Sequence, residues 1–379
     1  MTRGEVRVDM VRGPADARAF IELPFRLYRG DPHWVPPLRR AELRRWSPTH
    51  NPALRNRQAS RFLARRKGHV VGRIVASLDE SFANRWAPGT GFFGFFECED
   101  EESGLELFAC AHSWLREHGA TAVTGPVHLS THDEVGLLVQ GFQSPPTILS
   151  PYNPPWYERW VLQAGYRPAR DYHAYLWTSA AQPGGGPAVQ RLARAAARRA
   201  GTAARIRIRA VDPRRWNEEV RTLWSLYNSA FDGLWGFVTM TWQEFRARAA
   251  EFRAFYRPEL VLIAEVDGLP AGFGLILPDV NAALQRVRGR LLPFGWLRLM
   301  RDVPRLRVGR FILAGVLPKY TGLGVAPLLA HVMDGAVRRL GMRSVELSLV
   351  QEGNVRMRHV IDAFGCQPCK TYRLYKRPL

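Results

Sequence analysis

The stretch RFILAGVLPKYTGLGVAPLLAHVMDGAVRRL, residues 310–340, decides the fold that we predict for this chain. Its residues 311–318 (FILAGVLP) form the apolar run of a buried strand, and a helical pattern follows from Pro327 to Leu340. Between them, Gly322 and Gly324 allow a tight turn that points several backbone N–H groups in the same direction, at the positive end of the helix that begins there. A Gly-x-Gly also marks ordinary turns. The loop is therefore predicted to be a cradle for an anionic diphosphate, with an ordinary turn as the alternative.

The segments after this helix indicate a family. A second apolar strand (Ser344 to Val350) is followed by Asn354, a short helix and Gly365. The order of strand, Lys-x-x-Gly-x-Gly, helix, strand, Asn, helix and Gly resembles the acetyl-CoA-binding half of the GNAT-type N-acetyltransferases. In that family the loop carries Arg/Gln-x-x-Gly-x-Gly/Ala, so Lys319 departs from the pattern and keeps the positive charge.

The resemblance implies a set of residues that hold acetyl-CoA or another acyl-CoA as co-substrate. A backbone N–H of Val316 or Leu317 would polarise the thioester carbonyl. The full implied set is Val316, Leu317, Lys319, Tyr320, Thr321, Gly322, Leu323, Gly324, Val325, Ala326 and Asn354.

The strand Ser344 to Val350 carries the predicted catalytic carboxylate. Glu346 and Ser348 share one face of this strand, while Val345, Leu347 and Leu349 share the other. A carboxylate on a central strand suits a base that receives the amine proton. Alternatively, Glu346 forms a structural ion pair with one of the arginines.

The proton donor for the leaving thiolate departs from the family pattern. Seven residues after the motif asparagine the family has a tyrosine, and this chain has Ile361, which cannot donate a proton. Tyr320, Tyr372 or His359 would substitute, or solvent would serve. We take Tyr320 as the catalytic candidate beside Glu346 and Ser348. The missing tyrosine also fits a protein that binds acyl-CoA without catalysis.

Length and composition predict two globular domains. The chain has 379 residues, of which 46% are hydrophobic and 11% aromatic. A run of about 18 apolar residues, which would span a membrane, does not occur, and MTRGEVRVDM lacks the apolar core of a signal peptide. These features predict a cytoplasmic protein that is not an integral membrane protein.

The four cysteines predict neither a disulfide framework nor a metal site. They stand at positions 98, 110, 366 and 369, too scattered for a framework, and no second cysteine pair completes a zinc site. Cys366-Gln-Pro-Cys369 is either a redox pair or two packed thiols.

The net charge of +20 leaves a nucleic-acid partner open. Only four of the 54 basic residues are lysines, a bias that a GC-rich genome produces through codon usage. The charge is spread along the chain, and no nucleic-acid-binding module stands out. We therefore expect a small-molecule amine as the acceptor, with coenzyme A, itself a polyanion, using part of the basic surface.

An internal repeat divides the chain. The pattern Gly-x-x-Pro-x-basic-x-Tyr-x-x-Tyr occurs at 165–175 and again at 365–375. Upstream, each half has a strand, a helix opened by proline (Pro14; Pro213) and a hairpin around Lys67-Gly68 or Asp267-Gly268. We predict a mixed α/β fold of two tandem acyltransferase-like domains, 1–180 and 205–379.

Residues 181–204 are predicted to connect the two domains. Gln182-Pro-Gly-Gly-Gly-Pro187 forms a turn-rich hinge with few contacts, and a basic surface helix follows from Val189 to Ala200. In the C-terminal half, Thr241-Trp-Gln-Glu244 predicts a capping box that opens a helix running to about Tyr256.

The N-terminal half has acids where the phosphate loop would stand. After its strand at Thr90–Phe96 come five carboxylates within Glu97–Glu102, which would repel a diphosphate. Acids also favourably cap the helix predicted for Ser103–His118. The co-substrate site is therefore assigned to the C-terminal half.

Two further segments have more than one interpretation. The polar segment His128-Leu-Ser-Thr-His132-Asp133-Glu134, with Tyr152 and Asn153, forms an acceptor-binding wall or a hydrogen-bonded loop, and a metal site there is disfavoured by the irregular spacing.

The insertion Asn281–Gly309, with Phe294 and Trp296, packs between domains, closes over a long acyl chain, or docks on an anionic membrane.

The resemblance extends over nearly the whole chain. Segments such as Asp31-Pro-His-Trp-Val-Pro-Pro-Leu38, Gly91-Phe-Phe-Gly-Phe-Phe-Glu97 and Pro151-Tyr-Asn-Pro154 are similar to a bacterial group of this length in the acyl-CoA N-acyltransferase superfamily. It implies transfer of acetyl or a longer acyl group to a primary amine. The alternatives are a non-catalytic acyl-CoA sensor or scaffold, and a transferase acting on an aminoacyl-tRNA or a lipid-linked acceptor.

Overall fold

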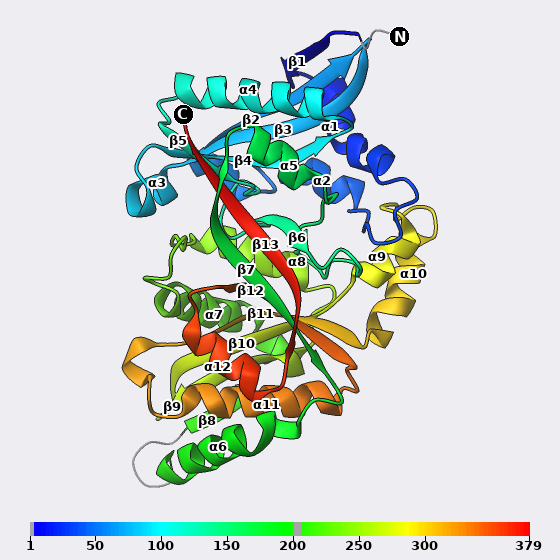
Figure 1. Cartoon of the computed structure of the whole chain (residues 1–379). Helices are drawn as coiled ribbons and strands as arrows, with labels where there is room; N and C mark the ends of the chain where they lie inside the picture. The colour runs from blue at the N-terminus through cyan, green and yellow to red at the C-terminus, as the bar shows by residue number, and fades with distance from the viewer. Residues whose placement is uncertain (1–3, 201–205) are drawn as a thin grey trace.

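The computed structural model describes residues 4–200 and 206–379 and contains one mixed sheet of 13 strands (Figure 1). The N-terminal half consists of β1 (Val6–Met10), α1 (Pro14–Leu27), α2 (Arg39–Arg45), β2 (Arg57–Arg66), β3 (His69–Asp79), α3 (Glu80–Trp86), β4 (Thr90–Cys98), α4 (Glu101–Glu117), β5 (Ala122–Gly125), β6 (Leu137–Gln140), α5 (Tyr157–Gln163) and β7 (Arg167–Thr178).

Over its described residues, the C-terminal half repeats this order with seven helices in place of five and without a counterpart of β6. It consists of α6 (Gly186–Ala200), β8 (Ile206–Ala210), α7 (Trp216–Ala230), α8 (Trp242–Phe252), β9 (Val261–Val266), β10 (Leu269–Pro278), α9 (Asn281–Val287), α10 (Gly295–Asp302), β11 (Val308–Val316), α11 (Val325–Arg339), β12 (Ser344–Gln351), α12 (Val355–Ala363) and β13 (Gln367–Pro378). Short 3-10 turns connect several of these elements. The predicted mixed α/β fold is confirmed.

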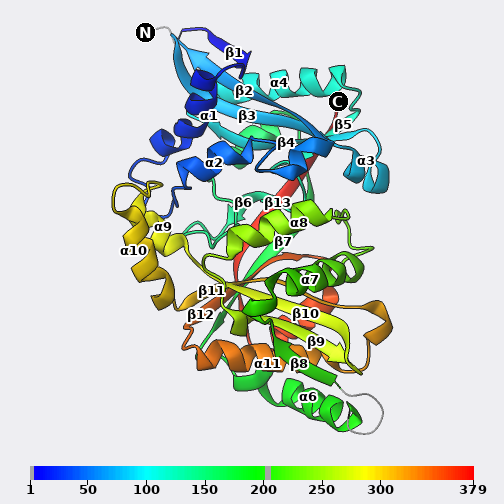
Figure 2. The ribbon, with the colours of Figure 1, turned by 180° about the vertical axis from the view of Figure 1, so that it is seen from behind.

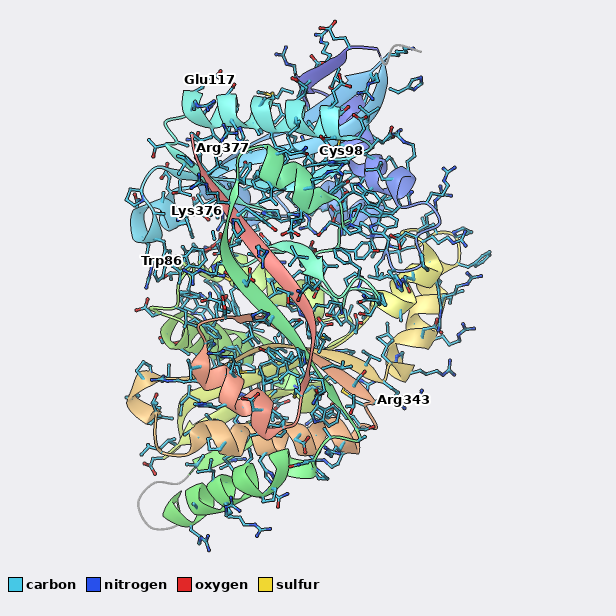
Figure 3. All side chains as sticks on the ribbon, viewed as in Figure 1. Trp86, Cys98, Glu117, Arg343, Lys376 and Arg377 are labelled. Atoms are coloured by element: carbon cyan, nitrogen blue, oxygen red, sulfur yellow. The ribbon has the colours of Figure 1, made fainter. Side chains whose placement is uncertain are left out.

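The last strand of each half lies against the other half. The sheet order is β1-β2-β3-β4-β5-β13-β7-β12-β11-β10-β9-β8, and the remaining strand, β6, pairs with β13 off this path. β13 thus pairs with β5, and β7 pairs with β12. Figures 1 and 2 show β7 and β13 running side by side between the two halves. In Figure 3, Lys376 and Arg377 of β13 lie in the upper half, while Arg343, just before β12, lies in the lower half. The repeat thus identifies two equivalent strands, and their exchange joins the halves into one sheet.

Helices cover both faces of the C-terminal part of the sheet. Phe273 of β10 packs with Leu226 and Tyr227 of α7, whereas the neighbouring Gly274 faces Met333 of α11. Since side chains alternate along a strand, α7 and α11 lie on opposite faces. In the N-terminal half, α4 packs on β1, β2 and β3.

Local predictions are largely confirmed. The hairpins turn at Lys67-Gly68 and Asp267-Gly268, where all four residues have positive φ. Thr241 and Glu244 form the capping box of α8. This helix ends at Phe252, short of the predicted Tyr256.

The predicted hinge is held in place, which corrects the expectation of few contacts. Gly184 N donates to Asp334 Oδ2 of α11 at 2.6 Å, and Arg338 donates to the carbonyl oxygens of Ser179 and Ala181. The division of the chain into domains at residues 180 and 205 stays a prediction. Among the residues that the structure describes, no helix is long and apolar enough to cross a bilayer.

Candidate functional site

The loop between β11 and α11 presents unengaged backbone N–H groups. Gly322 has φ +87° and Gly324, the N-cap of α11, has φ +90°. These values lie in the left-handed region, which glycine adopts without a Cβ clash. Within the described part of the chain, the N–H groups of Gly322, Gly324, Val325 and Ala326 have no acceptor, whereas Leu323 N reaches Tyr320 O at 3.4 Å. Four free donors at the start of a 15-residue helix form a site suited to an anion.

The loop is open to solvent. A Cβ added at Gly322 would meet nothing within 4 Å, and Leu323 is 41% exposed. Val325 is buried against Ala264, Val266 and Ala271 and anchors the start of the helix. The loop is therefore fixed at its helical end and accessible at its glycines.

Strands β11 and β12 separate just before this loop. Their parallel pairing runs from Val308–Ser344 to Phe311–Leu347 and stops there, whereas β12 stays paired with β7 on its other edge as far as Gln351. On the other side of β11, Ile312 has no partner in β10, because the register shifts there. A gap between two parallel strands thus opens toward the diphosphate loop.

The two N–H groups proposed for the thioester carbonyl differ in their surroundings. Leu317 N donates to Ala271 O at 2.8 Å and is engaged in the β10 ladder. Because donors alternate along a strand, the N–H of Val316 points the other way, toward β12 beyond the end of its ladder. Of the two candidates, Val316 is the one with a free donor in the gap.

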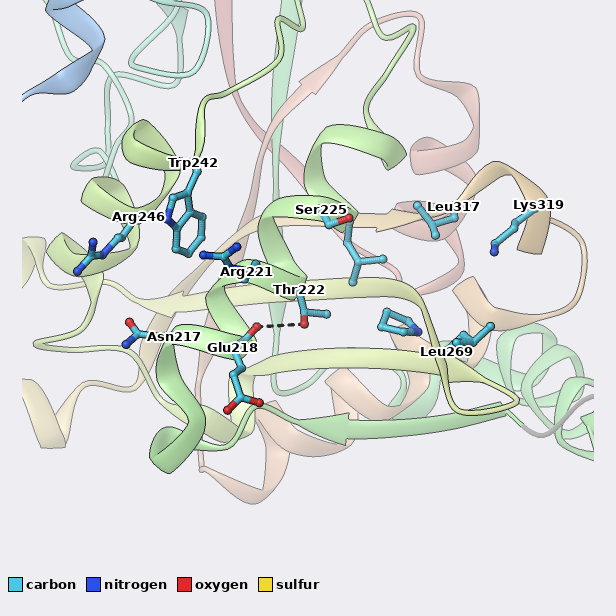
Figure 4. A pocket seen from close by; sticks show the side chains of 12 residues that line it. Asn217, Glu218, Arg221, Thr222, Ser225, Trp242, Arg246, Leu269, Leu317 and Lys319 are labelled. Carbon is cyan, nitrogen blue, oxygen red and sulfur yellow. Dashed lines mark hydrogen bonds between the residues drawn. The ribbon is translucent and has the colours of Figure 1, made fainter.

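A pocket of about 790 Å³ lies next to Leu317 and Lys319 (Figure 4). Its walls come from α7, α8, the β9–β10 turn and the end of β11. Its lining residues are Asn217, Glu218, Arg221, Thr222, Ser225, Leu226, Trp242, Arg246, Leu269, Pro270, Leu317 and Lys319. Three of these are cationic and one is anionic, so the pocket favours an anionic ligand.

The equivalent place in the N-terminal half is closed. β4 and β5 also pair only over Thr90–Phe92, but Val127 N donates to Phe93 O at 2.8 Å beyond that point. The acidic segment caps α4, as predicted: Asp100 accepts from Ser103 N and pairs with Arg66. These acids occupy the position of the glycines in the C-terminal half.

Glu346 is held in a buried polar cluster. Its Oε1 accepts from Thr147 Oγ1 at 2.7 Å and from Ser348 Oγ at 2.9 Å, and its Oε2 accepts from Lys370 Nζ at 2.6 Å. Arg310 lies beside it and donates to the carbonyl oxygens of Ile148 and Ser348. The structure therefore brings Glu346 and Ser348 together, and the ion-pair partner is a lysine rather than an arginine.

Burial and charge act in opposite directions on the carboxylates of this cluster. Desolvation raises the pKa of Glu346, but Lys370, Thr147 and Arg310 outweigh it, so this pKa is lowered overall. At the nearby Asp279, burial dominates and raises the pKa to about 6, although Asn281 N and Ile148 N donate to its carboxylate. Glu346 is thus a charged acceptor at neutral pH.

Tyr320 lies apart from Glu346 and Ser348. It packs against the buried cluster of Ala264, Val266, Ala271 and Val325, below the ammonium group of Lys319 at 4.7 Å from the ring centroid. Glu346 shares none of these contacts. Asn354 Oδ1 accepts from Met357 N at 3.1 Å, which makes Asn354 the N-cap of α12.

The other proposed proton donors are placed differently. Ile361 is fully buried in the core beneath α11, and His359 is exposed on α12. Tyr372 is fully buried, and its pKa is raised by burial and by the nearby charge of Glu346. Tyr372 is therefore the tyrosine that shares an environment with Glu346.

The polar segment 128–134 connects the two halves. His132 lies between the Tyr227 hydroxyl and the Val238 carbonyl oxygen, 2.8 Å from each, and burial lowers the pKa of His132 to about 4. Asp133 pairs with Arg248 of α8. This arrangement fits the hydrogen-bonded loop that we considered. In the described ranges no group of three His, Cys, Asp or Glu side chains is arranged to hold a metal ion, and all four cysteines are free thiols.

Sequence reasoning missed most partners of Glu346. Thr147 and Lys370 are 199 and 24 residues away along the chain. Lys370 alone carried a signal, because it occupies the basic position of the repeat that Arg170 occupies in the first half. Asp279 and Arg310 became neighbours only through the sheet topology.

Comparisons with known proteins identify relatives along the whole chain, although no family model matches. The chain is 35% identical over 389 residues to the bacterial ceramide synthase of Caulobacter vibrioides, covering 100% of this chain and 99% of the relative. It is 32% identical over 371 residues to protein YghO of Escherichia coli K12, covering 96% and 93%.

A solved structure shows the same architecture. The tandem GNAT protein from the clavulanic acid biosynthesis pathway aligns with a TM-score of 0.53 at 14% identity, covering 99% of this chain and 98% of that one. At this identity the match concerns the fold alone. The chain therefore has the fold of the tandem GNAT proteins and belongs to one family with YghO and the bacterial ceramide synthase.

Proposed function

We propose that this protein transfers an acyl group from acyl-CoA to the primary amine of a lipid-like acceptor, and that the C-terminal half performs the reaction. The observation that carries the proposal is the set of four free N–H groups at the start of α11, beside the gap between β11 and β12. A diphosphate bound at these donors would direct the pantetheine arm into the gap, toward the N–H of Val316.

The reaction needs two groups in the gap. The amine nitrogen attacks the thioester carbonyl carbon, the carbon–sulfur bond breaks, and the amine loses one proton while the thiolate gains one. The N–H of Val316 would stabilise the negative charge that develops on the carbonyl oxygen. The amine proton would pass through water to the Ser348 hydroxyl, which donates to Glu346 Oε1 at 2.9 Å.

We propose Tyr372 as the residue that donates a proton to the leaving thiolate. Tyr372 shares the environment of Glu346, whereas Tyr320 lies at the loop beside Lys319. The pKa of a thiol is low enough that its thiolate leaves with little assistance. Solvent at the open loop would therefore also serve as the proton donor. Loss of the family tyrosine at Ile361 is therefore compatible with turnover.

The acceptor class follows from the relative of highest identity reported above. A ceramide is a long-chain amino alcohol whose amine carries an acyl group, and the name of the Caulobacter relative concerns that chemistry. We extend it to this chain as a proposal: the acceptor is a long-chain amino alcohol, and the co-substrate is acetyl-CoA or a longer acyl-CoA.

The test is turnover with matched acceptors. The full chain is incubated with acyl-CoA of increasing chain length and either a long-chain amino alcohol or a short one that has the same head group. We expect release of free CoA thiol and an equal amount of amide, measured by mass spectrometry, with the long-chain acceptor preferred. Tight acyl-CoA binding without amide formation would instead identify a sensor, and preference for the short amine would remove the lipid assignment.

A further inference from the structure

The segment of residues 281–309, which contains α9 and α10, exposes apolar side chains beside arginines. Five of its apolar side chains are solvent-exposed: Leu292 at 77%, Phe294 at 67%, Trp296 at 44%, Leu297 at 47% and Met300 at 66%. Isolated exposed apolar residues are ordinary, but five within nine residues form a patch that marks an interaction site.

The geometry of α10 places three of these residues on one side. Trp296 and Met300 are one helical turn apart, and Leu297 and Met300 are three residues apart, so their side chains are neighbours. Arg301 and Arg298 follow on the adjoining side, and Asp302 is buried. The helix thus has an apolar side flanked by cations, the pattern of helices that lie at a membrane surface.

The charge of the segment is strongly one-sided. Seven arginines, at positions 286, 288, 290, 298, 301, 305 and 307, accompany a single acid, Asp302. Asp302 is already paired with Arg286 at 2.8 Å and with Arg301 at 3.0 Å. Within the described residues, Arg288, Arg290 and Arg298 have no carboxylate partner. An anionic surface would supply those partners.

The inner part of the segment is anchored to the protein. Asn281 Nδ2 donates to Pro146 O at 2.7 Å, and Gln285 Nε2 donates to Pro32 O at 3.2 Å. Arg39 reaches Arg288 O at 3.2 Å. Packing between the halves, one of the roles expected for this insertion, is therefore performed by α9, while the chain from Leu292 to Met300 remains exposed.

The exposed side chains of α10 argue against a lid over a long acyl chain. A lid would turn its apolar side chains inward, whereas these side chains face solvent. In Figures 1 and 2, α9 and α10 lie at one edge of the molecule, and the loop that precedes α11 lies at the opposite edge.

We propose that this segment docks the protein on an anionic lipid bilayer, with Leu292, Phe294, Trp296, Leu297 and Met300 entering the interface and Arg288, Arg290 and Arg298 contacting lipid phosphates. We call these eight residues the docking face. The inference goes beyond the proposed function, because it concerns attachment of the whole protein and is measured without turnover. It would bring the enzyme to the surface in which a long-chain acceptor dissolves.

The test is co-sedimentation of the full chain with vesicles. One set contains phosphatidylcholine alone, and the other has about one third phosphatidylglycerol. We expect binding to the anionic vesicles that weakens with added salt. Phe294→Glu with Met300→Glu should lower the partition coefficient by at least about tenfold. The matched control is Trp156→Glu with Leu162→Glu, two apolar residues of the N-terminal half that are 50% and 44% exposed.

The arginines are tested separately. Arg288→Glu, Arg290→Glu and Arg298→Glu together should abolish the preference for anionic vesicles, while Arg191→Glu, Arg194→Glu and Arg356→Glu, with the same change in net charge, should retain it. Equal losses in both triple variants, or equal binding to neutral vesicles, would overturn the proposal. Light scattering covers the remaining case: if the native chain is a dimer that Phe294→Glu with Met300→Glu dissociates, a second copy covers this face and the proposal is wrong.

Discussion

Lys370 Nζ of β13 lies 2.6 Å from Glu346 Oε2 of β12, and the two side chains are only 4% and 3% exposed. These strands are not neighbours, because β7 stands between them in the sheet. The ion pair therefore reaches across the strand that the N-terminal half contributes. It joins the C-terminal strand to the sheet of its own half at the point where the halves exchange strands.

Removing the lysine should be strongly destabilising. In Lys370→Met, Glu346 remains buried beside Thr147 and Ser348 but loses its cationic partner, so we expect the free energy of unfolding to fall by about 3–5 kcal/mol. The measurement is urea unfolding followed by far-UV circular dichroism at neutral pH.

Two variants serve as controls for this pair. Lys376→Met removes an exposed lysine from the same strand and should change stability by less than about 0.5 kcal/mol. Adding Glu346→Gln to Lys370→Met removes the unpaired charge and should recover part of the loss. A Lys370→Met variant as stable as Lys376→Met would show that the pair carries no net stability.

Local features, which depend on residues close together in the sequence, were predicted correctly. The turn at Asp267-Gly268 and the capping box of Thr241 and Glu244 involve residues adjacent or three apart, and both are present in the structure. The shared face of Glu346 and Ser348 follows from strand alternation and is also confirmed.

Long-range pairing could not be read in the same way. The repeated pattern at 165–175 and 365–375 gives β7 and β13 similar sequences. It does not specify which half of the chain each strand pairs with. The partner of Glu346 depends on that choice, because Lys370 reaches it only when β13 lies beyond β7. The exchange of strands is thus a property of the sheet and not of any local segment.

The diphosphate loop can be tested at Gly322. A carboxylate in Gly322→Glu would stand among the free N–H groups at the start of α11 and repel an anionic ligand. We expect acyl-CoA binding, measured by isothermal titration calorimetry, to be lost while circular dichroism shows a folded protein.

The control for this substitution is Gly119→Glu. Gly119 has φ +82° and, like Gly322, open space around its missing Cβ, so both substitutions carry a similar backbone strain of about 1–2 kcal/mol. Gly119 follows α4 in the N-terminal half, and its variant should bind acyl-CoA normally. Unchanged affinity in Gly322→Glu would place the co-substrate elsewhere.

Glu97 should make the stability of the N-terminal half depend on pH. Burial raises the pKa of Glu97 from its ordinary 4.5 to about 7, against the opposing effects of Arg73, Tyr28 and Tyr157. Between these two values the folded protein keeps a proton that the unfolded chain releases. The free energy of unfolding should therefore fall as pH rises from 4.5 to 7, by roughly 3 kcal/mol, and level off above pH 7.

Replacement of that carboxyl isolates the effect. Glu97→Gln keeps a polar group for Tyr28 and Tyr157 and removes the titration, so its stability should lose this slope. Glu117→Gln, at the exposed end of α4, should keep it. Parallel pH profiles for the native chain and Glu97→Gln would show that Glu97 titrates alike in both states.

The N–H of Val316 can be removed without breaking the β10 ladder. Leu317, not Val316, donates to Ala271 O, so Val316→Pro deletes only the donor that faces the gap. We expect kcat for acyl transfer to fall by about 100- to 1000-fold, with acyl-CoA affinity retained, because the donor acts on the oxygen of the transition state. Val316→Ala keeps the N–H and loses the same packing, so its kcat should remain within about tenfold of the native value. If the alanine variant lost as much activity as the proline variant, the side chain rather than the donor would be responsible.

Leu317→Pro completes the comparison. It breaks the hydrogen bond to Ala271 O and should lower the stability of the fold, whereas Val316→Pro should not lower it further than Val316→Ala.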